Sequence, residues 1–221
     1  MTRSALLVGA TGLVGRHCLD ALLADDAYHA VTTLGRRPLD CAHAKLVHHT
    51  IDFDHLDLHD DFLGAQDVFC CLGTTMAQAG SKEAFRRVDH DYPLRLAQRA
   101  HGCGAEQYLL VSALGADADS WIFYNQVKGE VEAAISAVPF AGVYLFRPSL
   151  LIGERPNPRT GEQVAETLMN AFSFVFQGPL RKYRPTPADA VARGMVTVAK
   201  AQPGGVRIYE PDAIEEVLTE G

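Results

Sequence analysis

The sequence has little of several features that would each point to a particular class of protein. Its 221 residues include only one tryptophan and five cysteines, and no cysteine pair has CxxC spacing. A disulfide-stapled secreted domain is therefore not expected. No run of about 18 apolar residues occurs, so no membrane span is predicted. Basic residues are the minority, 20 against 27 acidic ones for a net charge of −7, which argues against nucleic acid or an anionic membrane as a partner.

What is present is the composition of an ordinary globular protein, with 48% apolar and 21% charged residues. At this length we expect one domain spanning residues 1–221. Arg3 and the apolar stretch after it resemble a short signal peptide, but three glycines interrupt the stretch, so a strand entering a turn is the better interpretation. We therefore predict a cytoplasmic protein. The cysteines are interpreted as small buried side chains, with a metal or redox site as the alternative: Cys18, Cys41, Cys70, Cys71 and Cys103.

Short β-branched runs alternate with longer amphipathic stretches along the chain. The predicted strands are Ala5–Gly9, Ala30–Gly35, Lys45–Ile51, Asp67–Leu72, Gln107–Ser112, Gly142–Arg147 and Val206–Tyr209. The predicted helices are Leu13–Ala24, Lys82–Ala100, Ser120–Ala137, Gly161–Phe176, Pro187–Lys200 and Pro211–Leu218. This alternation predicts a Rossmann-type, doubly wound α/β fold: a mostly parallel sheet with helices on both faces. Residues 149–186 are expected to form a small C-terminal lobe that covers the substrate.

Gly9, Gly12 and Gly15 lie in the stretch GATGLVG, directly between the first predicted strand and the first predicted helix. A turn this tight needs backbone angles that glycine adopts easily. It lets a pyrophosphate approach the backbone and the positive end of the helix dipole. We therefore predict a dinucleotide site, with a plain glycine-rich turn as the alternative.

The second predicted strand ends in Gly35, Arg36 and Arg37 rather than in an acidic residue. NAD-binding proteins usually have an Asp or Glu at this point, which bonds the ribose 2′-hydroxyl. Guanidinium groups instead suit a 2′-phosphate and can stack on adenine. The sequence therefore predicts NADP(H) in preference to NAD(H); in the alternative, Arg37 is only a solvated surface charge.

Tyr124 and Lys128 form a YxxxK motif on a predicted helix, and Ser112 ends the strand before it. Residues four apart share a helix face, so the phenol and the ammonium would be neighbours. In carbonyl reduction Tyr124 would donate a proton, Ser112 a hydrogen bond and Lys128 positive charge. The motif alone also fits an ordinary amphipathic helix, and its combination with the glycine turn and Ser112 is what favours catalysis.

These features together resemble one subgroup of the short-chain dehydrogenase/reductases, the atypical, Tat-interacting-protein-like NAD(P)H-binding oxidoreductases. The resemblance extends from about residue 4 to about residue 200 and is carried by GATGLVG, LGRRP, FCCLGTT, VDHDY, YNQVKGEVE and FRPSLL. It implies a bound NADPH. The residues expected to contact the cofactor are Gly9, Thr11, Gly12, Leu13, Val14, Gly15, Arg36, Arg37, Asp52, Phe53, Leu72, Gly73, Thr74, Tyr124, Lys128, Pro148, Ser149, Leu150 and Leu151.

The sequence departs from this family at one active-site position. Many members carry an Asn on the helix after the fourth strand, and the nearest match here is Asp89. By resemblance, many relatives pair two such helices with a second subunit. The sequence leaves open whether Lys82–Ala100 and Ser120–Ala137 form a homodimer in this way or remain in a monomer.

Histidines are concentrated in one short aspartate-rich stretch, at His43, His48, His49, His55 and His59. His55 and His59 have the spacing that would let them share a metal on a helix. No third ligand is fixed by spacing, so we favour a solvated surface and predict no metal.

The function predicted from the sequence is NADPH-dependent reduction of a small organic carbonyl compound. One alternative is an NADPH-sensing regulatory protein with little turnover. Another is a sugar-nucleotide epimerase, which uses the same trio of residues, but a chain this short has little room for a nucleotide-sugar domain.

Overall fold

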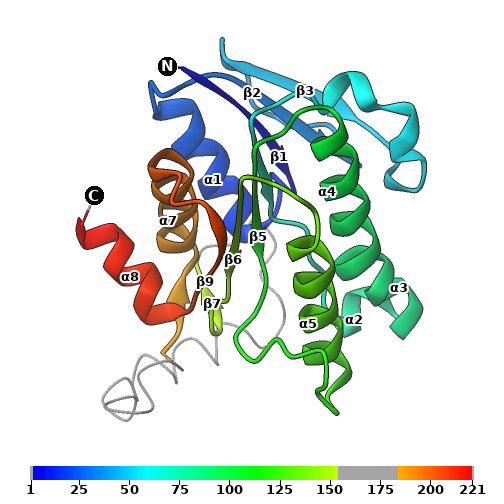
Figure 1. Cartoon of the computed structure of the whole chain (residues 1–221). Helices are drawn as coiled ribbons and strands as arrows, with labels where there is room; N and C mark the ends of the chain where they lie inside the picture. Colours follow the sequence, from blue (N-terminus) through cyan, green and yellow to red (C-terminus); the bar gives the residue numbers. More distant parts are fainter. Residues whose placement is uncertain (1, 154–183, 221) are drawn as a thin grey trace.

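The computed structural model describes residues 2–153 and 184–220 and centres on a parallel sheet (Figure 1). Its seven strands have the order β3-β2-β1-β4-β5-β6-β9. They are β1 (Arg3–Val8), β2 (Tyr28–Gly35), β3 (Leu46–Thr50), β4 (Asp67–Cys70), β5 (Gln107–Val111), β6 (Gly142–Phe146) and β9 (Gly205–Tyr209). The predicted Rossmann-type sheet is confirmed. The strand order reverses between β1 and β4, where doubly wound sheets open their ligand crevice.

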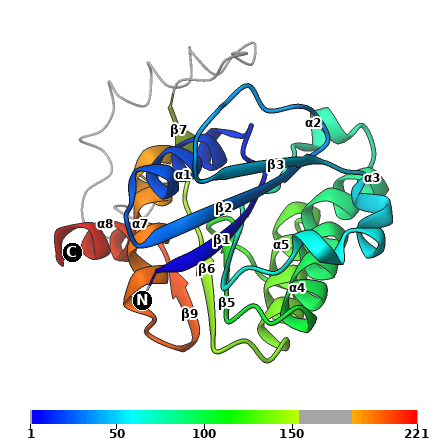
Figure 2. The same cartoon turned by 90° about the horizontal axis from the view of Figure 1, so that it is seen from above.

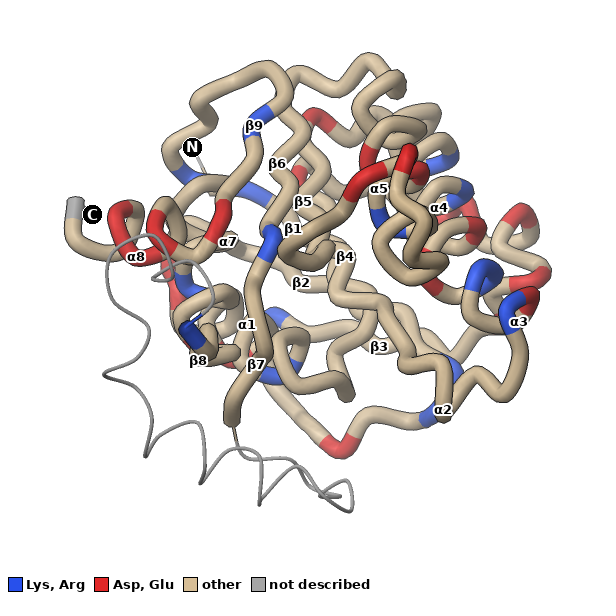
Figure 3. Tube along the Cα trace, turned by 90° about the horizontal axis from the view of Figure 1, so that it is seen from below, with Lys and Arg blue, Asp and Glu red and all other residues tan. Residues whose placement is uncertain are grey.

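Helices cover both faces of this sheet (Figures 1 and 2). On one side lie α1 (Leu13–Ala24), α7 (Ala188–Ala201) and α8 (Pro211–Glu220). On the other lie α3 (Lys82–Arg86), α4 (Tyr92–Gly102) and α5 (Phe123–Ser136). Lys and Arg positions are interspersed with Asp and Glu positions over the outer helices (Figure 3).

Each face of the sheet has its own hydrophobic core, because successive strand residues point to opposite faces. Leu6 and Val68 belong to the core under α4 and α5, while Leu7 and Phe69 belong to the core under α1 and α7. All four are fully buried. Burial of one such side chain contributes about 1.5–3 kcal/mol to the stability of the fold. Because these strands are buried on both faces, their sequences are continuous apolar runs.

The predicted helix Lys82–Ala100 is interrupted by a π-helical turn. It begins as α3, capped by the Ser81 hydroxyl, which accepts a hydrogen bond from the Ala84 N–H. It then widens into the π turn Arg87–Asp91 before continuing as α4. A π turn holds one more residue than an α turn and is often found at functional sites. Here it buries Asp89 to 1% exposure.

Other boundaries differ from the prediction by a few residues. The predicted helix Ser120–Ala137 begins at Phe123 instead, because the Ser120 hydroxyl accepts a hydrogen bond from the Ile122 N–H in a turn before it. Elements not predicted are α2 (Met76–Ala79), the 3₁₀ turns Phe53–Leu58 and Asp60–Phe62, and a second, two-stranded sheet of β7 (Leu151–Ile152) and β8 (Thr186–Pro187). The predicted helix Gly161–Phe176 and most of the lobe 149–186 lie outside the described residues.

The histidines and cysteines of the sequence analysis occupy varied surroundings. His55 is exposed and has non-helical backbone angles inside a 3₁₀ turn, so the α-helical spacing assumed for His55 and His59 is wrong.

Cys18 and Cys70 are buried as expected, but Cys41 is exposed. Burial raises the pKa of Cys70 to about 12. Among the described helices, none combines the length and apolar character needed to cross a membrane.

Candidate active site

The glycine turn brings the start of α1 against β1 and β4. Gly9 has φ +83°, and a Cβ there would lie 2.4 Å from the Cys71 carbonyl oxygen. A Cβ on Gly15 would lie 2.0 Å from the Gly9 carbonyl oxygen, and the Gly12 N–H donates to that same oxygen at 2.8 Å. Gly12 is the N-cap of α1 and supplies no side chain to it. The turn therefore leaves a cradle of backbone that fits a pyrophosphate at a helix N-terminus.

Of the other residues that were predicted to contact the cofactor, some have exposed side chains and others have buried ones. Thr11 is exposed and Leu13 is half-buried, whereas Val14 packs in the core. Asp52 follows β3 and caps the first 3₁₀ turn through the Asp54 N–H. Phe53 is 3% exposed and packs on Tyr92, with ring centroids 5.4 Å apart. The side chains of Phe53 and Val14 thus pack in the core.

Arg36 and Arg37 follow β2 directly and are exposed. Leu72, Gly73 and Thr74 follow β4, and Pro148 to Leu151 follow β6. All the strands are parallel, so these segments lie at one edge of the sheet with the glycine turn. That is the edge where open α/β sheets bind ligands.

Ser112 and Lys128 are both buried at this edge. Ser112 directly follows β5, and its hydroxyl has no hydrogen-bond partner among the described residues. A buried hydroxyl without a partner is costly, and one aimed at the crevice fits a ligand that accepts its hydrogen bond. Tyr124 lies one helical turn before Lys128 on α5 and is half-buried, with its ring centroid 5.5 Å from that of Phe85.

Asp89 joins Lys128 to the loop after β4. Its Oδ1 lies 2.7 Å from the Lys128 Nζ, and its Oδ2 accepts a hydrogen bond of 2.8 Å from the Thr74 N–H. Burial lowers the pKa of Lys128, but the charge of Asp89, helped by Tyr124, outweighs this and the net pKa is raised. Lys128 is therefore held as an ammonium beside the carboxylate of Asp89.

Gly129 is a residue of the site that the sequence analysis did not identify. A Cβ on it would lie 2.1 Å from the Ala118 backbone nitrogen, so α5 touches the loop after Ser112 backbone to backbone. The Asp117 N–H also donates to the Asn125 carbonyl at 3.0 Å. The signal was present in the sequence, because a glycine in mid-helix costs about 1 kcal/mol relative to alanine and calls for a reason.

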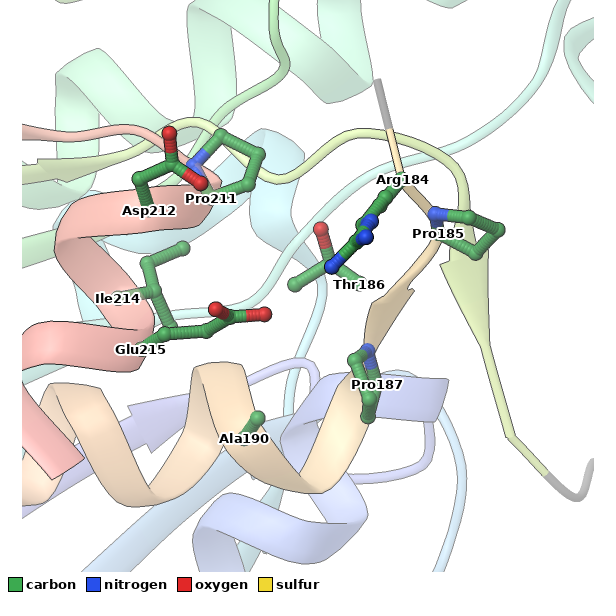
Figure 4. Close-up of a pocket in the computed structure, with 9 residues that line it drawn as sticks. All are labelled: Arg184, Pro185, Thr186, Pro187, Ala190, Pro211, Asp212, Ile214 and Glu215. Carbon is green, nitrogen blue, oxygen red and sulfur yellow. The ribbon is translucent and has the colours of Figure 1, made fainter. Parts of the chain in front are cut away.

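The segment after β6 is tied to its neighbours on two sides. The Leu114 N–H donates to the Pro148 carbonyl at 2.8 Å, and the Ser149 N–H donates to the Thr186 hydroxyl at 3.2 Å. Leu150 is 50% exposed. Beyond Thr186 a small pocket opens between β8, α7 and the start of α8, with the Arg184 and Glu215 side chains extending into it (Figure 4). The pocket does not include Ser112, Tyr124 or Lys128.

A family model described as NAD(P)H-binding matches residues 9–139, which span the glycine turn, Ser112 and the YxxxK motif. The chain belongs to this NAD(P)H-binding family. Protein HTATIP2 of Rattus norvegicus is 38% identical over 167 residues, 74% of this chain and 69% of that protein. The mitochondrial protein fmp52 of Emericella nidulans is 32% identical over 203 residues, 88% and 83% of the two chains. The expected resemblance to the Tat-interacting-protein-like, atypical short-chain dehydrogenase/reductases is confirmed.

Two solved structures that share this fold are longer than this chain. MoeE5 in complex with UDP-glucuronic acid and NAD has a TM-score of 0.71 at 19% identity and covers 94% of this chain and 76% of its own. DesIV, a dTDP-glucose 4,6-dehydratase of Streptomyces venezuelae with NAD and TYD bound, has a TM-score of 0.71 at 16% identity and covers 98% and 80%. At these identities the likeness shows the fold alone.

The predicted cytoplasmic location is wrong. The relatives from Emericella nidulans, Debaryomyces hansenii and Candida albicans are all named mitochondrial, which points to mitochondria. The prediction rested on reading the N-terminal segment as a strand rather than a signal peptide. That reading bears on secretion and does not distinguish the cytosol from an organelle to which a protein of this fold is delivered.

Proposed function

We propose that this NAD(P)H-binding protein is an NADPH-dependent oxidoreductase that reduces the carbonyl group of a small organic substrate. The observation that carries the proposal is the buried, unpartnered Ser112 hydroxyl at the same sheet edge as Tyr124, Lys128 and the glycine turn. A hydroxyl in that position gains a hydrogen-bond partner when the carbonyl oxygen of a substrate lies against it.

The residues present fit the cofactor. The backbone around Gly9, Gly12 and Gly15 would hold the pyrophosphate at the start of α1. The turn is so tight that a Cβ at Gly9 or Gly15 would lie 2.4 Å or 2.0 Å from a backbone oxygen. The exposed guanidinium groups of Arg36 and Arg37 would bind the 2′-phosphate that distinguishes NADPH from NADH. This pairing supports a preference for NADPH.

When bound, NADPH supplies a hydride to the carbonyl carbon of the substrate. Negative charge then develops on the carbonyl oxygen, and the Ser112 hydroxyl donates a hydrogen bond to it. The Tyr124 hydroxyl donates its proton to the same oxygen, which completes the alcohol. Lys128, charged and buried beside Tyr124, stabilises the phenolate that remains.

Asp89 is a positioning residue in this scheme. Its carboxylate holds the Lys128 ammonium with one oxygen and the Thr74 backbone with the other. The catalytic helix α5 is thereby connected to the loop after β4, which would lie beside the cofactor in this scheme.

Tyr124→Phe tests the proposal. We expect NADPH oxidation, followed by absorbance over a panel of aldehydes and ketones, to fall by about 10²–10⁴-fold, the usual contribution of a general acid. The Kd for NADPH should stay unchanged, because phenylalanine keeps the ring that packs on Phe85.

Two results would contradict it. Unchanged turnover in Tyr124→Phe would remove Tyr124 from the chemistry. Tight NADPH binding by the wild-type protein with no turnover of any carbonyl would favour an NADPH-sensing binding protein instead.

A further inference from the structure

His48 is fixed at both ring nitrogens, one of them bound to the turn that carries the arginines. It lies on β3, with Nδ1 2.8 Å from the Thr33 hydroxyl on β2 and Nε2 3.0 Å from the Arg37 carbonyl oxygen. A carbonyl only accepts hydrogen bonds, so Nε2 carries a hydrogen and donates it. In the neutral ring Nδ1 then accepts from the Thr33 hydroxyl, which is fully buried.

This contact determines where the turn after β2 goes. The Ile51 N–H donates to the Gly35 carbonyl at 2.8 Å and holds the beginning of the turn to the end of β3. Two residues later the His48 ring holds the Arg37 carbonyl. A Cβ on Gly35 would lie 3.2 Å from the His48 Cε1, so the missing side chain leaves room for the imidazole.

The arginines themselves need such support. Arg36 and Arg37 are exposed, and a long side chain on a mobile backbone loses conformational entropy when it binds a phosphate. Fixing the backbone of the turn in advance reduces that loss, which is the usual gain from preorganisation.

We propose that His48 is a specificity-determining positioning residue, which holds the Arg36–Arg37 turn so that the guanidinium groups meet the 2′-phosphate of NADPH. This inference rests on the proposed NADPH preference. His48 does not touch the cofactor in this scheme. It acts through the Arg37 carbonyl, and both of its nitrogens are occupied.

The test compares Kd values for NADPH and NADH by isothermal titration calorimetry in the wild-type protein and four variants. His48→Ala should weaken NADPH binding about 3- to 10-fold, the effect of one lost hydrogen bond, and leave NADH binding unchanged. His48→Gln should keep most of the NADPH affinity, because the glutamine amide nitrogen can reach the place of Nε2. Arg36→Ala should weaken NADPH binding alone.

His49→Ala is the matched control. His49 is the next residue on β3 and stacks on Phe62 with ring centroids 3.7 Å apart. Neighbouring strand residues point to opposite faces, so its loss should change neither Kd.

The outcomes distinguish a failure of the positioning role of His48 from a failure of the proposed NADPH preference. If wild-type protein prefers NADPH and Arg36→Ala weakens NADPH binding while His48→Ala leaves it unchanged, the positioning role of His48 is wrong and the cofactor preference stands. Equal weakening of both cofactors in His48→Ala would also overturn it, as a purely structural effect. If wild-type protein binds NADH as tightly as NADPH, both fail.

Discussion

Lys128 and Asp89 form a buried ion pair whose two members have opposite effects in the proposed mechanism. Lys128 supplies the positive charge that favours a phenolate, and Asp89 offsets part of that charge. An asparagine in the same place would hold the lysine without offsetting it. Because the pKa of Lys128 is raised in the folded protein, its stabilising contribution is fully present below the unfolded value of about 10.4 and is lost as the pH rises through the folded value.

Asp89→Asn is expected to narrow the pH range of activity from the alkaline side. Without the carboxylate, burial lowers the pKa of Lys128 with only smaller contributions such as that of Tyr124 against it, so the ammonium is lost at a lower pH. The alkaline limb of kcat for NADPH oxidation should move to lower pH, and the free energy of unfolding should fall by roughly 3 kcal/mol or more. A pH–rate profile and urea unfolding measure the two effects.

Asp91→Asn is the control on the same π turn. Its side chain is 46% exposed and pairs with His90 rather than with Lys128. An alkaline limb that stays in place in Asp89→Asn, or moves equally in both variants, would contradict the role given to the buried pair.

At the scale of elements, the glycine turn and the backbone contact at Gly129 set where the site residues lie. The first was predictable, since Gly9, Gly12 and Gly15 stand at fixed spacing between a strand and a helix. The second was not, because nothing in the sequence says which loop will approach the middle of α5. The contact replaces a side-chain layer with direct backbone packing between α5 and the Asp117–Ala118 loop.

Gly129→Ala is expected to displace that loop. The added Cβ would fall 2.1 Å from the Ala118 nitrogen, and overpacking of this kind costs about 1–3 kcal/mol. We expect a lower melting temperature and a lower kcat, with little change in the Kd for NADPH, because the displaced loop follows Ser112 and not the glycine turn.

Gly102→Ala is the matched helical control. A Cβ at Gly102, the last residue of α4, meets no atom within 4 Å. It should be neutral or slightly stabilising, since alanine narrows the unfolded ensemble. If both substitutions behaved alike, helix propensity rather than the loop contact would explain the result at Gly129.

The sequence predicted the strands and helices better than the contacts between them. Alternating apolar runs were enough for the parallel sheet, and the positions of Ser112, Tyr124 and Lys128 followed from it. The π turn could not be foreseen, because its α-helical and π-helical forms share one apolar pattern. The partnership of His48 with Arg37 was also hidden, since it depends on β3 lying beside β2 in a register that pairs Thr33 with His48.

At the scale of the whole molecule, the two edges of the sheet carry different networks. The edge opposite the site holds Asp67, fully buried, which accepts hydrogen bonds from Arg3, Tyr28 and Gln107. Burial, and next the charge of Asp67, raise the pKa of Tyr28. Gln107 also donates to the Ala199 carbonyl on α7. These bonds join four strands (β1, β2, β4 and β5) and a helix at a distance from the chemistry.

Asp67→Asn should therefore lower the free energy of unfolding without changing the affinity for NADPH. Removing one member of a buried ion pair costs about 3–5 kcal/mol, so the urea midpoint should fall sharply. Below the midpoint the Kd for NADPH should match that of the wild-type protein. A parallel loss of affinity under folding conditions would show that the two edges are coupled.

The π turn Arg87–Asp91 has one more consequence, which concerns how such a site can be gained or lost. It amounts to a single extra residue in a helix that is otherwise regular on both sides. Each residue of an α-helix turns the chain by about 100°. Deleting one codon within the turn would leave α4 packed on the sheet and swing the carboxylate of Asp89 away from Lys128. One insertion or deletion can thus switch this countercharge on or off while α4 keeps its packing on the sheet.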